Sequence, residues 1–211
     1  HHPSHLSIQR AQDWRWYCVL HPKHKRVVAS LYLNIDGDVA TSSIKSPFGT
    51  IESSDHLPPE VLYKLLGFAE DSVRHLGARK IIIKTPPLHY DLVKGSLLQV
   101  FFFNLGYTVI NAEVGTVRTT NNDFTVELNR LERRKLNQSD NSNLSCILLS
   151  NERKHEVYSF ISTCRQRKGY ALSMKFEDLQ QVMVQFPDRY LLIAVFLGEE
   201  MIAASVAVRI T

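Results

Sequence analysis

Strand-like alternation of apolar and polar residues marks the first part of the chain. Residues 14–20 and 26–42 are rich in β-branched and aromatic side chains, which favours strands. The second stretch contains Asp36-Gly37 between β-rich flanks. Because glycine adopts positive φ at no steric cost, this pair predicts a hairpin turn. Ser46-Pro47-Phe48-Gly49 then interrupts the alternation and predicts a loop.

Helical spacing replaces the alternation after this loop. Apolar residues recur at helical spacing from Leu62 to Leu76. Pro58 and Pro59 suit the first turn of a helix, and Gly77 suits its left-handed C-cap. The predicted elements are a helix over residues 58–76, a buried strand over 80–84, a helix over 90–104 and a strand over 107–117. This order of strands and helices predicts an α/β fold with a mixed sheet.

A polar break divides the chain at Thr120-Asn121-Asn122-Asp123, and a charged stretch follows it to Asn143. Beyond this stretch the predicted elements are a strand over residues 144–150, helices over 152–168 and 176–186, and strands over 190–197 and 201–210. We therefore expect two domains, residues 1–122 and residues 123–211. The last strand runs to Thr211 with nothing to cover its apolar face, so we expect the natural chain to continue or another chain to supply that layer.

Positive charge is concentrated in the second part of the chain. Nine basic and four acidic residues lie between Asn129 and Lys168, a net charge of +5, whereas the whole chain carries +4. The rest of the chain is therefore slightly acidic. This segment is either a solvated helix surface or the place where an anionic partner binds.

Composition narrows the class of protein. With 44% hydrophobic and 22% charged residues the chain is an ordinary globular polypeptide, and no apolar run reaches the roughly 18–20 residues of a membrane span. Its first residue is His1 and no charged-then-apolar leader follows, so we expect a leader to be absent or removed. Three scattered cysteines exclude a disulfide framework and a cysteine-rich zinc site. We expect a reducing, cytoplasmic compartment.

Familiar catalytic motifs are missing. The chain has no glycine-rich phosphate loop and no serine-hydrolase elbow. Its histidines cluster without cysteines or acids to complete a ligand set, so we expect no metal site. Cys164 shares a predicted helix face with Val157 and is expected in the core, and Glu52 is expected to be an ordinary exposed acid. The histidine clusters are His1-His2-His5 and His21-Pro22-Lys23-His24. Catalytic residues therefore stay unassigned.

A more specific signal is the segment Arg165-Gln166-Arg167-Lys168-Gly169-Tyr170. It places three cations in the last turn of a predicted helix, followed by a glycine and an aromatic residue. Cations at this position interact favourably with the negative end of the helix dipole, which explains them without a ligand. The alternative is an anion clamp in which Tyr170 supplies a stacking or hydrogen-bonding surface. Both interpretations stay open.

Several features together resemble the second half of FemAB/FemX-type acyltransferases, which are built from two GNAT (N-acetyltransferase-like) lobes. They are Arg133-Arg134-Lys135 after a helix, the strand over residues 144–150, the segment Arg165 to Met174, and a hairpin ending in Ile202-Ala203-Ala204-Ser205-Val206. The first half, with its hairpin, Ser46-Pro47-Phe48-Gly49 loop, helix and strand, is similar to their N-terminal lobe. The resemblance implies two GNAT-like lobes, of which the second is incomplete in this chain.

The resemblance also implies an activity. It points to an N-acyltransferase that moves an acyl or aminoacyl group from a carrier, either acyl-CoA or aminoacyl-tRNA, to an amine acceptor, with no covalently bound cofactor. Residues 129–143 are too short for the helical hairpin of some members that use aminoacyl-tRNA, which favours a CoA-type donor. By position, the residues expected to bind an anionic acceptor or carrier are Arg133, Arg134, Arg165 and Lys168, with Tyr170 beside them.

The donor loop is a further implication. In a GNAT lobe, a loop of the form Gln/Arg-x-x-Gly-x-Gly/Ala between the fourth strand and the next helix holds the pyrophosphate of the donor. Residues 47–52 stand at this place in the first lobe and do not match. In the second lobe we expect the loop after Thr211.

Two other functions fit the same residues. A non-catalytic α/β binding module would contact RNA or another anionic partner through the basic second half. Only Tyr158, Phe160 and Tyr170 accompany the charges, so nucleic acid other than a donor tRNA is not the favoured partner. A lobe without a working donor site would support assembly only.

Overall fold

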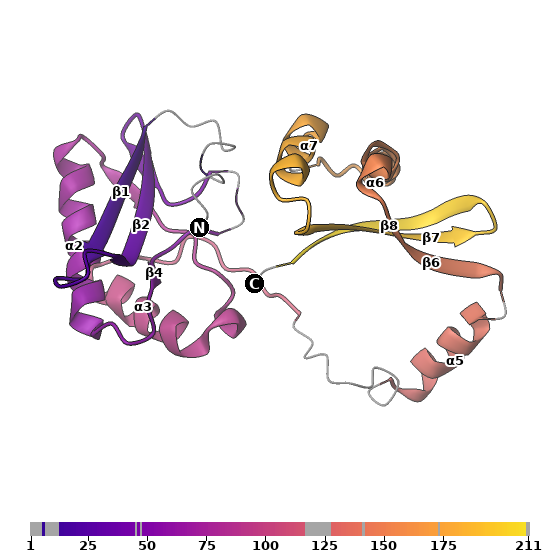
Figure 1. Ribbon diagram of the computed structural model, residues 1–211, viewed down its shortest axis with the longest axis horizontal. Coiled ribbons are helices and arrows are strands. Elements are labelled where there is room, and N and C mark those ends of the chain that lie inside the picture. Colours follow the sequence, from indigo (N-terminus) through magenta and orange to yellow (C-terminus); the bar gives the residue numbers. More distant parts are fainter. Residues whose placement is uncertain are drawn as a thin grey trace. The chain divides into compact units, whose positions relative to one another are not determined.

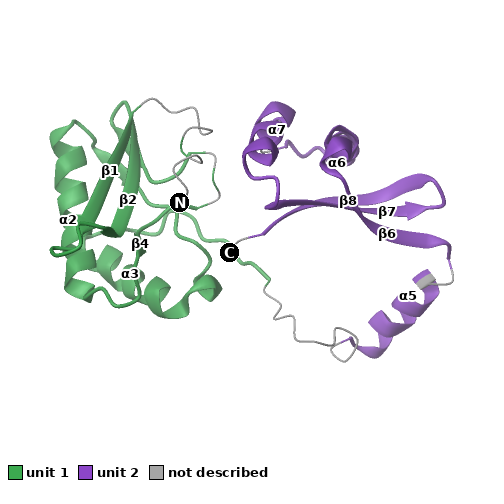
Figure 2. Ribbon diagram, in the orientation of Figure 1, with its two compact units in different colours: residues 1–117 green, residues 118–211 purple. Residues whose placement is uncertain are grey.

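The computed structural model describes residues 6, 13–44, 46, 48–116, 128–140, 142–172 and 174–209. The chain divides into two compact units, residues 1–117 (unit 1) and residues 118–211 (unit 2), which Figure 2 colours separately. The domain boundary expected after residue 122 falls outside the described residues. Each unit is α/β, and the mixed sheet expected from the sequence is found in unit 1.

Unit 1 is a sheet with strand order β1-β2-β3-β5, and β4 pairs with β2. Strands β1, β2 and β3 pair antiparallel, whereas β3 and β5 pair parallel. Gly37 has φ +57° at the β2–β3 turn, which confirms the predicted hairpin. The elements are β1 (Trp14–Leu20), β2 (Val27–Asp36), β3 (Val39–Thr41), β4 (Glu52–Ser53), α2 (Pro59–His75), β5 (Lys80–Ile82), a 3₁₀ turn (Leu88–Tyr90) and α3 (Leu92–Asn104).

The core of unit 1 follows from the alternation along β2. Leu31 and Leu33 project from one face of the sheet and are each only 1% exposed. They pack with the apolar stripe of α2, which includes Leu66 and Val73, and with α3 (Figure 1). The hydroxyl of Tyr17 on β1 donates a hydrogen bond to Ser72 Oγ at 3.1 Å and ties the strand to α2. Burial of this shared face holds the two helices on the sheet.

Two predictions for unit 1 are wrong. The described part of the expected strand over 107–117, residues 107–116, contains no strand, because the Tyr107 amide instead donates to the Phe102 carbonyl at the end of α3. The apolar Val109 that follows is 83% exposed and pairs with no strand. The strand expected over 80–84 is shorter, and Ile81 and Ile82 are only half-buried, because β5 is paired on one side alone among the described strands.

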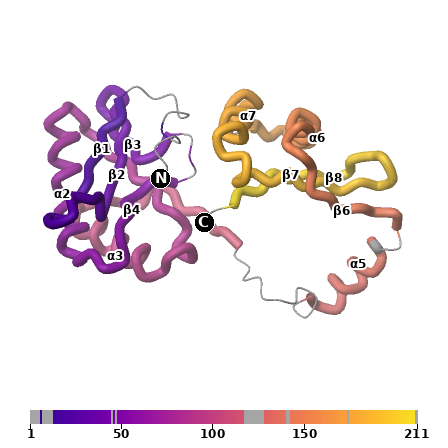
Figure 3. Tube along the Cα trace, viewed as in Figure 1, coloured from indigo at the N-terminus to yellow at the C-terminus, as the bar shows by residue number. Residues whose placement is uncertain are grey.

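Unit 2 holds the predicted β-α-α-β-β order, which the tube in Figure 3 follows from β6 to β8. Strands β6, β7 and β8 form an antiparallel sheet in that order. The first turn of the predicted helix over 152–168 is 3₁₀ rather than α. The elements are α5 (Arg130–Asp140), β6 (Leu144–Leu149), a 3₁₀ turn (Asn151–Arg153), α6 (Lys154–Arg167), α7 (Phe176–Gln185), β7 (Tyr190–Leu197) and β8 (Glu200–Val208).

The two faces of the unit 2 sheet differ. Leu192, Ala194 and Phe196 share one face of β7 and are buried, and α6 and α7 lie on one side of the sheet in Figure 1. On the opposite face, Leu148 is 65% exposed and Leu197 is 47% exposed. The helices therefore cover one face and leave an apolar face open among the described residues.

Helix α5 contains residues that we expected to follow a helix. Asn129 and Glu132 form a reciprocal capping box, in which each side chain accepts from the amide of the other, at 2.9 and 3.0 Å. This box starts α5 at Arg130, so Arg133 and Arg134 lie inside the helix. The expected position after a helix is wrong because the cap lies directly before them. Among the described residues, none of the helices has the length and apolarity needed to cross a membrane.

Candidate functional site

The structure divides the predicted basic set between two places in unit 2. Arg133 and Arg134 are exposed on α5, whereas Arg165 and Lys168 stand at the end of α6, with Tyr170 just beyond it. Figure 1 draws α5 apart from α6. Arg133 Nε donates to the Leu128 carbonyl beside the start of α5, whereas Arg165 lies over the Tyr170 ring. The site at α6 therefore consists of Arg165, Lys168 and Tyr170.

The end of α6 holds Arg165 against Tyr170. Gly169 adopts φ +72°, and the Tyr170 amide donates to the Arg165 carbonyl at 3.0 Å, which closes the helix with a tight reversal. This reversal brings the guanidinium carbon of Arg165 to 5.7 Å from the centre of the Tyr170 ring. Arg165 Nε also donates to the Ala171 carbonyl at 3.4 Å. The predicted combination of cation and aromatic ring is thus a real contact at the surface, of the kind worth about 0.5–1 kcal/mol.

A groove of about 350 Å³ opens between α6 and the start of α7. We call it the α6–α7 groove. It is lined by His155, Tyr158, Ser159, Ser162, Thr163, Phe176 and Glu177. Positions 155, 159 and 162 recur at helical spacing, which places them on one face of α6. Val157, on another face of the same helix, is fully buried. The groove therefore lies on the outer side of α6, away from its core-facing side.

Aromatic rings form one wall of the groove. The Phe176 ring meets His155 edge-on, with ring centres 5.0 Å apart, and meets Tyr158 at 5.3 Å. The Tyr158 hydroxyl donates a hydrogen bond to the Met174 carbonyl at 3.1 Å and so fixes the segment that leads into α7. Three hydroxyl side chains and the carboxylate of Glu177 complete the lining. The groove thus offers ring surfaces, hydroxyl oxygens and one negative charge.

The start of α2 in unit 1 does not fit the pyrophosphate of a CoA-type donor. Helix α2 follows the last antiparallel strands and precedes the parallel strand β5, the place where such a site is expected. Pro58 and Pro59 carry no N–H to donate at the helix start, and Glu60 adds a negative charge to the first turn. An anion is therefore disfavoured there.

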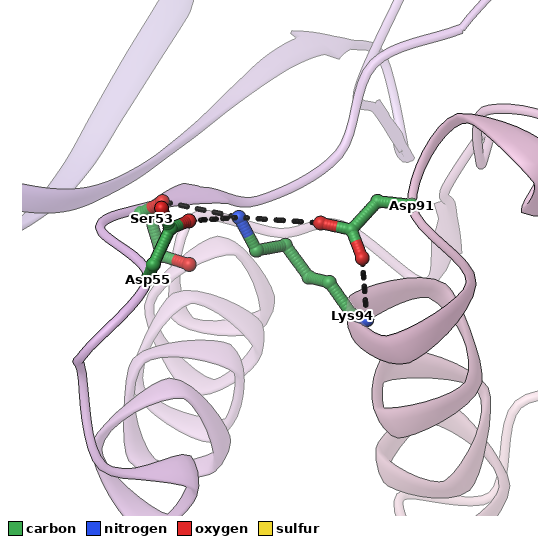
Figure 4. A network of polar contacts seen from close by, with 4 residues as sticks. All are labelled: Ser53, Asp55, Asp91 and Lys94. Carbon is green, nitrogen blue, oxygen red and sulfur yellow. Dashed lines mark hydrogen bonds and ion pairs between the residues drawn. The ribbon is translucent and has the colours of Figure 1, made fainter.

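The nearby Lys94 is also committed to other partners. Figure 4 shows its ammonium between the Ser53 carbonyl, at 3.1 Å, and two carboxylates, Asp91 at 3.8 Å and Asp55 at 4.0 Å. Asp91 additionally caps α3 by accepting from the Lys94 amide at 2.8 Å. This network joins the end of β4 to the start of α3. It is a structural link in which the charge of Lys94 is already neutralised, so we derive no donor chemistry from unit 1.

The histidines, Cys164 and Glu52 take ordinary positions. The Nδ1 atom of His21 accepts from the Lys23 and His24 amides at 3.2 Å each, so this nitrogen stabilises a turn and is not free for a metal. Among the described residues no cluster of three metal-binding side chains is found, and His1, His2 and His5 lie outside them. Cys164 is half-buried. Glu52 is exposed, as expected. Burial of Tyr32 raises the pKa of its hydroxyl, and the negative charge of Glu52 raises it further.

Sequence reasoning missed two features. The groove was not predicted, because Ser159, Ser162 and Thr163 look like any polar helix surface until α7 is in place. The second feature lies in unit 1, where three buried side-chain atoms have no hydrogen-bond partner among the described residues: Trp14 Nε1, Asn34 Nδ2 and Thr50 Oγ1. Trp14 and Asn34 face each other across β1 and β2. In the sequence, the feature that could have indicated these buried donors is Asn34, an asparagine inside an apolar strand.

Comparison with known proteins gives weak similarity to a solved structure. No family model matches the chain, and no curated protein matches it. A solved structure described as the crystal structure of a probable acetyltransferase aligns with 52% of this chain and 70% of its own, with 13% identity and a TM-score of 0.35. So loose a superposition assigns neither residues nor substrates to this chain.

Proposed function

We propose that this protein is a GNAT-like acyltransferase of the FemAB type, which transfers an acyl or aminoacyl group from a CoA-type carrier to an amine. The observation that carries the proposal is the β6-α6-α7-β7-β8 arrangement of unit 2, in which α6 ends in an ordered cation–aromatic pair. Both features belong to the segments on which the FemAB resemblance rests. The fold alone leaves the chemistry open, and the surface at the end of α6 supports the binding of an anionic group.

The reaction joins an amine to a thioester. The amine nitrogen attacks the thioester carbonyl carbon, the new C–N bond forms and the C–S bond breaks. The sulfur leaves with the electron pair of that bond, and the proton lost by the nitrogen ends on the released thiol. Arg165 and Lys168 present positive charge, with Tyr170 beside them, to an anionic group of the acceptor or carrier. Their role is to bind and orient, which lowers the barrier by proximity.

The proposal is tested by measuring amine-dependent release of the CoA thiol. The natural polypeptide that carries these residues is incubated with acetyl-CoA and a panel of amines bearing a carboxylate or phosphate. We expect release that depends on the amine. The double variant Arg165→Ala with Lys168→Ala should raise the KM for the amine about tenfold, because two charge-assisted contacts are lost.

A matched control keeps this test specific. The variant Lys64→Ala with Arg79→Ala removes two exposed cations from unit 1 and should leave the KM unchanged. Release that is equal with and without every amine would contradict a transferase. An unchanged KM in the Arg165 and Lys168 variant would contradict the assigned binding residues.

One observation favours a second candidate function. Helix α5 exposes Arg130, Arg133, Arg134 and Lys135 on a single short helix, which is the kind of surface that binds nucleic acid phosphates. A non-catalytic module that binds RNA would use this helix. Its affinity for RNA would fall steeply with salt, and Arg133→Ala with Arg134→Ala would flatten that dependence. Salt-independent or absent RNA binding would remove this alternative.

A further inference from the structure

We propose that the α6–α7 groove binds the ammonium form of a zwitterionic acceptor, while Arg165 at the end of the same helix binds the anionic group of that acceptor. The identity of this ligand as the acyl acceptor rests on the proposed function. The groove itself is a binding site that the resemblance does not assign. Its ligand class follows from the charges and rings that line it.

The groove is built for a cation. Glu177 is exposed and makes no ion pair among the described residues, so its carboxylate is available to an ammonium group. The rings of Tyr158 and Phe176 add a negative quadrupole, which attracts cations over their faces. Ser159 and Ser162 add hydroxyl oxygens that accept N–H hydrogen bonds. An ammonium has three N–H donors, and this lining offers a partner for each.

The anion-binding end lies on the same helix. Arg165 makes no ion pair in the described part of the chain, and its hydrogen bond to Ala171 uses one of five N–H donors. Contact with the Tyr170 ring orients the guanidinium without neutralising its charge. The end of α6 therefore offers a fork suited to a carboxylate or a phosphate.

The distance between the two ends limits the ligand. Tyr158, Ser162 and Arg165 follow at helical spacing, so they lie along one side of α6. Seven residues separate Tyr158 from Arg165, which at 1.5 Å of rise per residue is about 10 Å. If the ammonium sits at the Tyr158 ring, the ligand carries an amine and a carboxylate or phosphate about 10 Å apart. A short peptide and a phosphorylated amino sugar both have this chemistry.

A series of ω-amino acids measures this distance directly. An extended 8-aminooctanoate holds its two charges about 10 Å apart, whereas 3-aminopropionate is much shorter, and octylamine and octanoate each lack one charge. Binding of all four to the full 211-residue chain is followed by calorimetry without any acyl donor. We expect 8-aminooctanoate to bind about tenfold more tightly than each of the others, because only it engages both charged ends.

Two variants test which residue binds the ammonium group of the ligand and which binds its carboxylate. Glu177→Gln should lower the affinity for 8-aminooctanoate about tenfold and bring it to that of octanoate, and Arg165→Gln should bring it to that of octylamine. Glu199→Gln, an exposed acid in the β7–β8 turn, is the matched control and should change nothing. All three positions are exposed, so we expect each variant to fold, and circular dichroism checks that it does. Equal affinity for all four probes, or no effect of Glu177→Gln, would overturn the proposal.

Failure of this inference is distinguishable from failure of the proposed function. Charge-dependent binding of 8-aminooctanoate without any thiol release would retain the groove as a zwitterion site and contradict the acyltransferase. Amine-dependent thiol release with a KM unaffected by Glu177→Gln would retain the acyltransferase and overturn the groove as its acceptor site. Short-peptide and amino-sugar phosphate probes, tested next, identify the source of the zwitterion.

Discussion

Units 1 and 2 are both built from strands and helices, but they differ in how far the sheet is covered and in how charged side chains are paired. In unit 1, strands and two helices enclose a core in which Leu31 is 1% exposed, and the charge of Lys94 is absorbed by neighbouring carboxylates. In unit 2, helices cover one face of a three-stranded sheet and leave Leu148 65% exposed on the other. Unit 2 also keeps Arg165 and Glu177 without ion-pair partners among the described residues. The proposals above assign these two charges to a ligand.

Core truncation gives the largest expected effect and tests whether the two cores are separate. Leu31→Ala should cost about 2–5 kcal/mol in unit 1, and Leu192→Ala, at a fully buried position, should cost a similar amount in unit 2. Both tryptophans, Trp14 and Trp16, belong to unit 1, so tryptophan fluorescence reports its unfolding alone. Urea unfolding is followed by fluorescence and by circular dichroism.

The two variants should separate in these signals. Leu31→Ala should shift the fluorescence transition, whereas Leu192→Ala should shift only circular dichroism. Leu148→Ala, on the open face, should change the free energy of unfolding by less than about 0.5 kcal/mol. A fluorescence shift of the same size for Leu192→Ala would contradict the description of two separate cores.

Replacement of a glycine with positive φ should have the next largest effect on stability, and it should affect ligand binding only in unit 2. Alanine at Gly37 in unit 1 or at Gly169 in unit 2 should each cost about 1–2 kcal/mol, because both adopt φ above +50°. Only Gly169→Ala should also weaken binding of 8-aminooctanoate, since that glycine positions Tyr170 under Arg165. Thermal unfolding and calorimetry measure the two quantities. Equal binding in both variants would contradict the link between the α6 terminus and the groove.

High pH should affect unit 1 through Tyr107. Burial, helped by Glu70 and opposed by Arg74, raises the pKa of Tyr107 from 10.0 to about 12. Because the folded pKa exceeds the unfolded one, the stabilising contribution is complete below about pH 10 and is lost as pH rises towards 12. Phenolate absorbance should show an ionisation step at about pH 12 that Tyr107→Phe removes. A late step that persists in this variant would assign it to another residue, such as Tyr190 in unit 2, whose pKa burial also raises.

The smallest expected effect concerns the buried donor of Asn34. This residue is 4% exposed, and its Nδ2 atom has no hydrogen-bond partner in the part of the chain that the structure describes. Replacing Asn34 by Val removes an unsatisfied buried group, so the free energy of unfolding should stay equal or rise by about 1 kcal/mol. Fluorescence-detected urea unfolding measures this change. Destabilisation by more than that amount would show that the amide group is satisfied in solution.

Local signals predicted most of the fold. The hairpin at Gly37, the helix before Gly77 and the β-α-α-β-β order of unit 2 depend on neighbouring residues alone, and the structure confirms them. The strand expected over 107–117 depends on a partner strand, which alternation cannot supply, and its described part is not a strand. The same limit explains why the shortness of β5, which depends on its partner strands, could not be predicted.

The candidate site was predicted in part. The pattern that ends α6 identified Arg165 and Tyr170, because a cation, a glycine and an aromatic ring within six residues must lie close together. It could not separate these from Arg133 and Arg134, since distance along the chain does not give distance in space. The groove depends on how α7 starts against α6, which the Tyr158–Met174 hydrogen bond fixes. No local pattern encodes that contact.

Amine-dependent release of the CoA thiol from acetyl-CoA, by the natural polypeptide that carries these residues, tests the proposed acyl transfer most directly. We predict release that saturates with a zwitterionic amine, with a KM about tenfold higher when Arg165 and Lys168 are both replaced by alanine. Release that is independent of every amine, together with RNA binding that falls steeply with salt, would contradict it and identify a binding module instead.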